Sequence, residues 1–135
     1  DKTPLPHEYI FDLGEKKSFN NLEVYTRKTG EAVGVIGNYE IYVSDEYDGD
    51  NTTWTKIAED YTRKGNSNAP ADLKIKLPTT SAKYLKIKAL NNRDDYDLTI
   101  IAEVKLSTVT NIKNVIAQNS SFIKENGLGI MMELL

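Results

Sequence analysis

The sequence lacks cysteine, has a single histidine and a single tryptophan, and shows no large excess of charge of one sign. Without cysteine the 135-residue chain has no disulfide framework, no thiolate nucleophile and no thiolate metal ligand. Its 17 basic and 20 acidic residues are interspersed, so it offers no basic stripe of the kind that nucleic-acid partners require. No apolar run reaches the ~18 residues of a membrane-spanning helix, and the start DKTPLPHEY shows no signal-peptide pattern. A mature secreted fragment would look the same, so composition leaves the compartment open.

The sequence does contain a series of short segments in which apolar and polar residues alternate, as in half-buried β-strands. Glycine and proline stand between these segments as turn signals. Seven short strands separated in this way favour an all-β fold, an antiparallel β-sandwich in a single domain. The segments are residues 8–13, 22–25, 39–43, 54–58, 73–77, 84–89 and 98–106. After residue 107 the apolar residues fall near helical spacing, which predicts a short C-terminal helix.

The only tryptophan, Trp54, follows a loop crowded with Asp, Gly and Asn, DEYDGDN. We interpret this loop as a hairpin connection and expect Trp54 to open the next strand facing the core, because a large aromatic side chain buries much apolar area. A calcium loop is the alternative, because hard oxygen ligands are present at Asp45, Asp48, Asp50 and Asn51. The spacing of these ligands lacks the one-three-five pattern and the closing Glu of the helix-loop-helix calcium site.

Six phrases follow one another over residues 1–107: PHEYIFDLG, NNLEVYTRKTG, GVIGNYEIYVS, the loop before WTKIA, SAKYLKIKAL and IIAEVKLS. In this order they resemble the discoidin, or coagulation factor type C, domain, and within it the bacterial family 32 carbohydrate-binding modules. The resemblance implies a jelly-roll, galactose-binding-like β-sandwich over residues 1–107, with residues 108–135 as an extension or the start of a following domain. It also implies that loops at one end of the sandwich bind ligands, commonly galactose-type sugars.

The chain departs from the family at its start. The family normally begins with a first strand and an aspartate-rich turn, and this chain starts after that region. In the resembling modules the turn supplies most ligands of a structural calcium, and a Glu of the last strand completes the set. Glu103 in AEV is similar to that Glu. By itself it cannot hold calcium, which takes about six to eight oxygen ligands, and an ordinary polar strand residue is the alternative interpretation.

Sugar recognition requires two kinds of side chain in such loops. The hydroxyls of a pyranose pair with fixed donors such as Arg or Asn, and its apolar face stacks on an aromatic ring. Arg27 in VYTRKTG is similar to the arginine that the family places after this phrase, and a solvated loop arginine is the alternative. Where the family has a sugar-binding asparagine, this chain has Val33, which removes a donor and an acceptor from the expected galactose site.

A second candidate loop is NNRDDYD, residues 91–97, which precedes the final predicted strand. The resembling modules often present a stacking aromatic here, so Tyr96 is the predicted stacking ring and Arg93 a predicted hydrogen-bond donor. The alternative is an ordinary polar turn with one aromatic residue. His7, in LPHEYIFDLG, is a further candidate for a ligand-facing side chain, with a residue at the start of a strand as the alternative.

Catalysis is disfavoured because the chain offers one histidine, no cysteine, and acidic pairs that fall in turns. We therefore predict a noncatalytic, lectin-like carbohydrate-binding module that keeps a larger bacterial protein, secreted or at the cell surface, near glycans. Two alternatives stay open: a discoidin-like domain that binds protein or lipid, and a spacer domain. The candidate loops are polar and mixed in charge, which argues against membrane insertion, and the apolar end LGIMMELL is predicted to pack on a neighbouring domain.

Overall fold

The computed structural model describes residues 4–26, 34–62 and 72–109. Within these residues the chain forms five strands and one short 3-10 turn: β1 (His7–Tyr25), β2 (Asn38–Ser44), η1 (Gly49–Asn51), β3 (Thr55–Tyr61), β4 (Leu73–Ala89) and β5 (Glu103–Ser107). No helix in this part of the chain has the length and apolar character that crossing a membrane requires. The predicted C-terminal helix and most of the predicted extension 108–135 lie outside the described residues.

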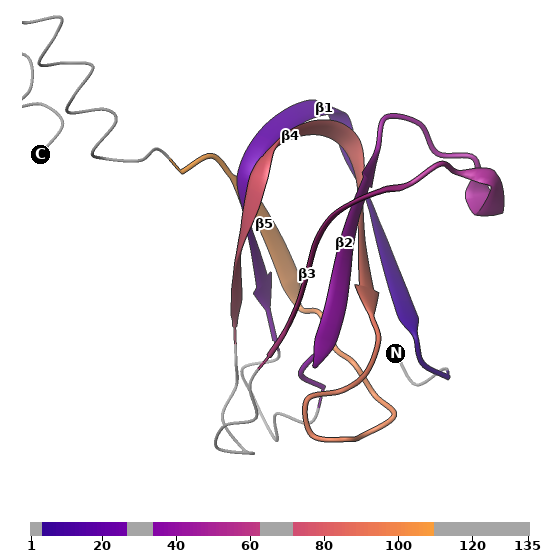
Figure 1. Cartoon of the computed structure of the whole chain (residues 1–135), viewed down its shortest axis with the longest axis vertical. Coiled ribbons are helices and arrows are strands. Elements are labelled where there is room, and N and C mark those ends of the chain that lie inside the picture. Colours follow the sequence, from indigo (N-terminus) through magenta and orange to yellow (C-terminus); the bar gives the residue numbers. More distant parts are fainter. Residues whose placement is uncertain (1–3, 27–33, 63–71, 110–135) are drawn as a thin grey trace, which may run out of the picture.

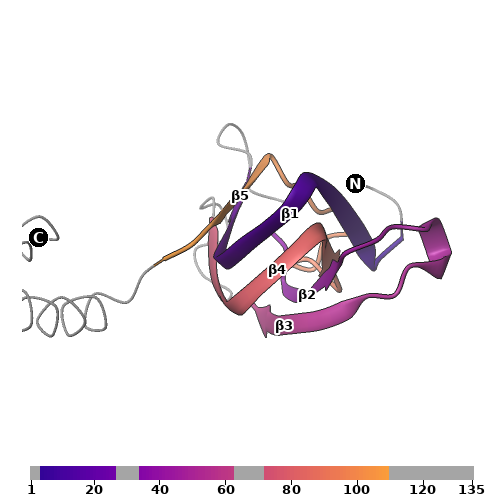
Figure 2. The ribbon, with the colours of Figure 1, turned by 90° about the horizontal axis from the view of Figure 1, so that it is seen from above.

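All five strands belong to one antiparallel sheet in the order β3-β2-β4-β1-β5. β1 and β4 are long and bend together over the top of the molecule, so the sheet folds back on itself (Figures 1 and 2). Residues 7–12 of β1 and 84–89 of β4 form one leaf with β2 and β3. Residues 21–24 and 73–76 form the facing leaf with β5. The predicted all-β, antiparallel sandwich fold is confirmed.

The bend explains why two predicted strand breaks are absent. The pairing register of β1 and β4 shifts between Asp12 and Lys17 and again between Phe19 and Asn21, which marks the two places where the strands are irregular. Gly14, at φ +84°, lies in the first of these places. Pro78 lies on β4 opposite the second, where the regular ladder is interrupted. Both residues therefore bend a continuous strand instead of ending it.

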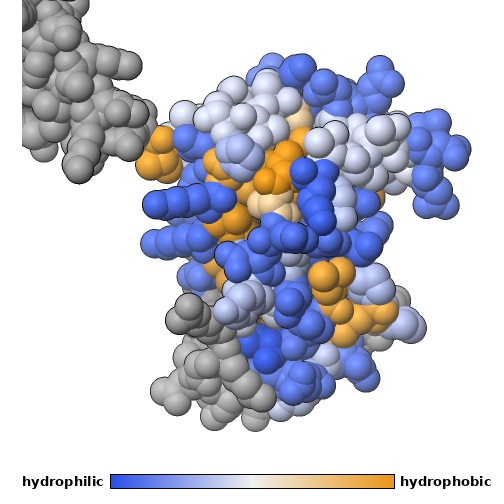
Figure 3. Space-filling model, in the orientation of Figure 1, coloured by the Kyte–Doolittle hydropathy of each residue, from blue (hydrophilic) through white to orange (hydrophobic). Residues whose placement is uncertain are grey.

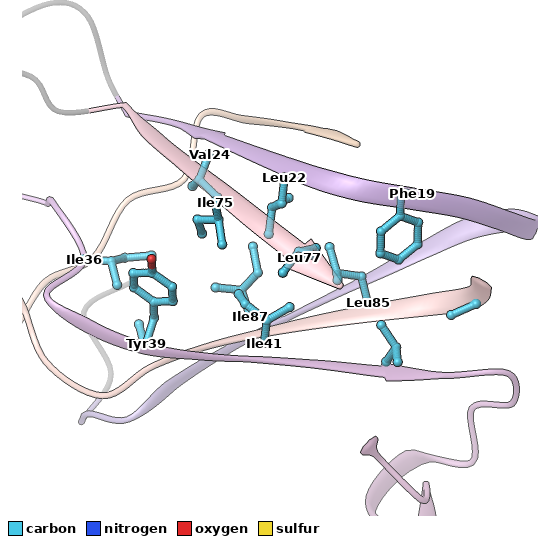
Figure 4. Close-up of a cluster of buried hydrophobic side chains, with 13 residues drawn as sticks. Phe19, Leu22, Val24, Ile36, Tyr39, Ile41, Ile75, Leu77, Leu85 and Ile87 are labelled. Atoms are coloured by element: carbon cyan, nitrogen blue, oxygen red, sulfur yellow. The ribbon is translucent and has the colours of Figure 1, made fainter. Parts of the chain in front are cut away.

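The core lies between the two leaves (Figure 4). Alternation along each strand directs one set of side chains inward, so that Ile41 and Leu85 of one leaf face Leu22 and Ile75 of the other. Phe19 fills the space beneath the bend. In the orientation of Figure 1, polar residues cover most of the surface, and hydrophobic residues show mainly in the gap between the leaves (Figure 3). The predicted alternation thus gives one contiguous core.

Trp54 does not face this core, so that prediction is wrong. The predicted hairpin between β2 and β3 forms, but the indole packs on the outer face of the sheet, where the Lys86 ammonium lies 4.8 Å from the Trp54 ring centroid and 4.7 Å from that of Tyr42. Tyr47, in the loop before η1, packs against the same indole, with 6.5 Å between the ring centroids. The inner face is filled by aliphatic side chains of β2 and β4, and the cation on the outer face provides a favourable partner for the indole.

Candidate functional site

The segment after β4, residues 90–102, is held against the segment before β2 by a series of backbone hydrogen bonds. The two segments meet at the lower end of the sandwich, beyond the starts of β2 and β5 (Figure 1). An isolated bridge between Ile36 and Asn92 marks the centre of this junction. The N–H to carbonyl distances are Leu90 to Asn38 2.8 Å, Gly37 to Asn91 2.9 Å, Arg93 to Val35 2.8 Å and Ile100 to Gly34 2.8 Å. A connection without regular secondary structure is therefore fixed almost as firmly as a strand.

Two glycines make this close approach possible. A β-carbon on Gly37 would lie 2.1 Å from Oδ1 of Asn91 and 3.1 Å from the backbone nitrogen of Arg93. A β-carbon on Gly34 would lie 2.5 Å from Cγ1 of Ile100. Both distances to side-chain atoms are far below van der Waals contact, so only glycine fits without displacing the facing segment. The sequence shows these residues only as the G-V-I-G of a strand-flanking phrase.

Asparagine side chains complete the junction. The amide of Asn91 accepts a hydrogen bond from the Asn38 N–H at 2.7 Å and donates to Oδ1 of Asn38 at 3.2 Å. Asn92 is buried, donates to the carbonyl of Leu98, and accepts from the Asp94 N–H at 2.7 Å. These bonds close the loop 92–98 on itself, as Asx side chains do in turns. The sequence prediction treated Asn91 and Asn92 as ordinary polar turn residues and so missed their structural role.

His7 and Arg93, two of the predicted ligand contacts, are buried in the structure. The exposed fraction of His7 is 1%, and its Nδ1 lies 2.6 Å from Oγ1 of Thr99, which also contacts the hydroxyl of Tyr9. The Arg93 side chain is 3% exposed and binds the Asp94 carboxylate through Nε and Nη2, with 2.9 Å from Nη2 to Oδ2. Each side chain therefore fixes the loop from inside instead of presenting a donor to a ligand.

Tyr96 is the predicted site residue that the structure does present at the surface, with 51% of the residue exposed. It stands in the turn after Asp95, which adopts φ +65° in the left-handed region that Asp tolerates better than most residues. Arg27 and Val33 lie outside the described residues, in the segment that joins β1 to Gly34. At the end of β1, a hydrogen bond from the Tyr25 hydroxyl to Glu23 raises the pKa of Tyr25 to about 12.

Glu103 opens β5, opposite Tyr25 of β1, and is exposed. Among residues 4–26, 34–62 and 72–109 no three His, Cys, Asp or Glu side chains cluster in a way that could hold a metal ion. The described residues that lack such a cluster include the acidic loop between β2 and β3, which was the alternative calcium site in the sequence. Glu103 alone would supply at most two of the roughly six to eight oxygen ligands of a calcium ion.

The profile of the F5/8 type C domain matches residues 1–104, which is most of the sequence. This match agrees with the antiparallel β-sandwich described above. The chain belongs to the F5/8 type C domain family.

Solved structures similar to this chain include carbohydrate-binding modules. A family 32 module of Clostridium perfringens, in complex with GalNAc-β-1,3-galactose, shares 24% identity and a TM-score of 0.63, over 78% of this chain and 68% of that one. The family 32 module of NanJ from the same organism, in complex with galactose, shares 22% identity and a TM-score of 0.56, over 76% and 67%. The C-terminal domain of a chitobiase from Bacteroides fragilis shares 25% identity and a TM-score of 0.60, over 80% and 67%.

The curated proteins similar to this F5/8 type C domain include a galactose oxidase of Gibberella zeae, with 28% identity over 126 residues. That match covers 92% of this chain and 16% of the enzyme. The chain thus spans about one sixth of its curated relative, and the similarity concerns one part of a larger protein.

Proposed function

We propose that this domain is a noncatalytic carbohydrate-binding module whose site lies on the loops at the lower end of the sandwich. The observation that carries the proposal is the loop 91–98, which is held rigid by buried polar contacts and presents Tyr96 to solvent. Binding a sugar requires an aromatic face and hydrogen-bonding groups in fixed positions, and no proton transfer. Solved structures of similar domains contain galactose and GalNAc-β-1,3-galactose, which supports galactose-type sugars as the ligand class.

The chemistry of the proposed site follows from two side chains with different tasks. The ring of Tyr96 supplies an apolar face for the C–H groups of a pyranose, and its hydroxyl offers one more hydrogen bond. Arg27, which lies outside the described residues, is proposed to supply a planar donor fork that suits two vicinal hydroxyls. Arg93 and Asp94 act indirectly, because their ion pair holds the turn in which Tyr96 stands. A shallow site of this kind gives dissociation constants of about micromolar to millimolar.

A Tyr96→Ala variant is expected to weaken binding of the best sugar about tenfold, since an aromatic contact contributes about 0.5–1.5 kcal/mol beyond the area it buries. A glycan array first identifies the sugar, and titration calorimetry then compares wild type, Tyr96→Ala and Arg27→Ala. Tyr47→Ala is the matched control, because Tyr47 is 48% exposed but follows the opposite end of β2. Equal affinities for Tyr96→Ala and wild type, or no sugar bound at millimolar concentration, would reject the proposed site.

We further propose that the domain keeps a larger secreted or cell-surface protein near its glycan, and that avidity from neighbouring modules raises a weak affinity. The 16% coverage of a galactose oxidase is consistent with such an appended role.

Calcium is a separate hypothesis: the ion would need ligands beyond Glu103 and beyond the described residues. Melting curves with and without calcium, on wild type and Glu103→Gln, test it, since a bound ion raises the melting temperature by mass action.

A further inference from the structure

A hollow lies at the ends of β2, β3 and β4, next to the start of the loop 91–98: Leu90, one of its lining residues, immediately precedes Asn91. It has a volume of about 250 Å3, enough for one small group but below the ~300 Å3 of sites that enclose whole drug-sized ligands. Two of its residues expose apolar surface: Tyr61, which is 56% exposed, and Leu90, which is 38% exposed. The residues that line it are Asn38, Tyr39, Glu40, Glu59, Asp60, Tyr61 and Leu90.

This hollow is joined rigidly to the loop that carries Tyr96. Tyr61 pairs with Asn38 across the β2–β3 ladder, and the side chain of Asn38 is bonded to Asn91, the residue at which that loop begins. Leu90 immediately precedes Asn91 and donates its N–H to the Asn38 carbonyl at 2.8 Å. Tyr61 and Tyr96 are two of the exposed aromatic residues of the described surface, and the contacts through Asn38 tie the hollow to the first residue of the loop on which Tyr96 stands. A ligand that bridged both rings would meet a preformed surface.

The polar groups of the hollow suit hydroxyl groups. Asp60 accepts the Tyr61 N–H at 2.8 Å, and an ionised carboxylate has further lone pairs to accept sugar hydroxyls. Glu40 and Glu59 share the ammonium of Lys56, at 3.3 and 3.0 Å. The hydrogen bond from Tyr42 and the contacts with Lys56 lower the pKa of Glu40, and Lys88 also lies near enough to lower it.

The described residues that line the hollow include three carboxylates, of Glu40, Glu59 and Asp60, and no cation. Lys74 and Lys76 line an adjacent hollow together with Glu59 and Asp60, so cations flank two of these carboxylates. The three carboxylates disfavour an acidic sugar and can accept the hydroxyl groups of a neutral one, so the hollow fits a neutral pyranose.

We propose that the hollow at Asn38, Tyr61 and Leu90 is a second sugar subsite, which takes the neutral pyranose next to the one bound at Tyr96. The inference rests on the proposed carbohydrate-binding function and extends it from single sugars to chains of two or more units. The Tyr61 ring stacks on the second sugar, and the Asn38 amide and Asp60 carboxylate bind its hydroxyls.

Calorimetry of the full chain with galactose and with GalNAc-β-1,3-galactose tests the subsite. In wild type we expect the disaccharide to bind about tenfold more tightly than galactose, the gain of one additional stacking contact. Tyr61→Ala is expected to remove this difference and leave the galactose affinity unchanged. Leu90→Ala serves as a second, independent variant of the same hollow, and Tyr47→Ala is the control for loss of an exposed tyrosine elsewhere.

The outcomes separate the two proposals. If galactose binds and requires Tyr96, but the disaccharide binds no more tightly or Tyr61→Ala and Leu90→Ala both retain the gain, the subsite is rejected and the binding function stands. If neither sugar binds the wild type, the galactose-type function fails and the subsite fails with it. A gain lost in Tyr61→Ala and in Leu90→Ala but kept in Tyr47→Ala supports the subsite.

Discussion

A Gly37→Ala variant is expected to lose about 3 kcal/mol of unfolding free energy and most of its sugar affinity, because the added methyl group cannot be placed without moving the loop that carries Tyr96. The methyl carbon would lie 2.1 Å from Oδ1 of Asn91 and 3.1 Å from the backbone of Asn92 and Arg93. The first contact is with a side chain, but that side chain is bonded twice to Asn38 and cannot turn away without losing both bonds. Urea unfolding measures the loss of stability, and calorimetry measures the affinity.

The Asn91→Ala background provides the control for this prediction. Replacing Asn91 removes the atom nearest to the new methyl group and leaves the 3.1 Å backbone contacts, which require a shift of only a few tenths of an ångström. The cost of Gly37→Ala should therefore be clearly smaller in Asn91→Ala than in wild type, as a double-mutant cycle would show. Equal costs in the two backgrounds would mean that the destabilisation does not arise from the junction between residues 34–38 and 90–102.

Most of the fold could be predicted from the sequence because it depends on alternation, which is local. The period-two segments correctly predicted β2 and both halves of β1 and β4. The bends at Gly14 and Pro78 were mistaken for strand ends, since these residues interrupt regular pairing in either case. The predicted strand 98–106 is a strand only from Glu103, because its first residues use their backbone groups in the junction: Ile100 bonds to Gly34 and Ala102 bonds to Tyr25.

The candidate site was less predictable because its side chains are defined by distant partners. Tyr96 stands at the surface, as its place in a polar turn suggests. His7 and Arg93 have residue types that suit a ligand site, and nothing local to either shows that it is buried. The contact that decides the role of His7 is with Thr99, 92 positions away. Trp54 was misplaced for a related reason, because the cation that covers its ring, Lys86, comes from another strand.

The contrast between Tyr96 and Arg93 suggests how the loop works. Three positions apart on the same turn, one side chain is exposed and the other is almost fully enclosed with Asp94. The enclosed pair and the buried Asn92 fix the backbone on either side of the exposed ring. A shallow site gains affinity from such preorganisation, since little conformational entropy is lost when the ligand binds. Arg93, which the sequence suggested as a ligand contact, therefore has a positioning role in the proposed site.

Thr99→Val is expected to cost about 2 kcal/mol of stability and to weaken sugar binding at Tyr96, although valine matches threonine in shape. The Thr99 hydroxyl is fully buried and contacts both the Nδ1 of His7 and the hydroxyl of Tyr9, which also donates to the Thr99 carbonyl at 3.2 Å, so Thr99 ties the loop after Tyr96 to the start of β1. A methyl group in place of the hydroxyl removes its two contacts and leaves His7 with one polar contact fewer in the interior, where such losses are expensive.

Thr99→Ser separates the hydroxyl from the shape of the side chain. Serine keeps the hydroxyl and removes a methyl group, so it should retain the link to His7 and Tyr9 and most of the sugar affinity at the cost of a small cavity. Binding that is weaker in Thr99→Val than in Thr99→Ser, measured where both variants are fully folded, would show that the buried hydroxyl positions the loop. Valine and serine variants of equal affinity would show instead that the backbone junction with residues 34–38 is sufficient to hold Tyr96 in place.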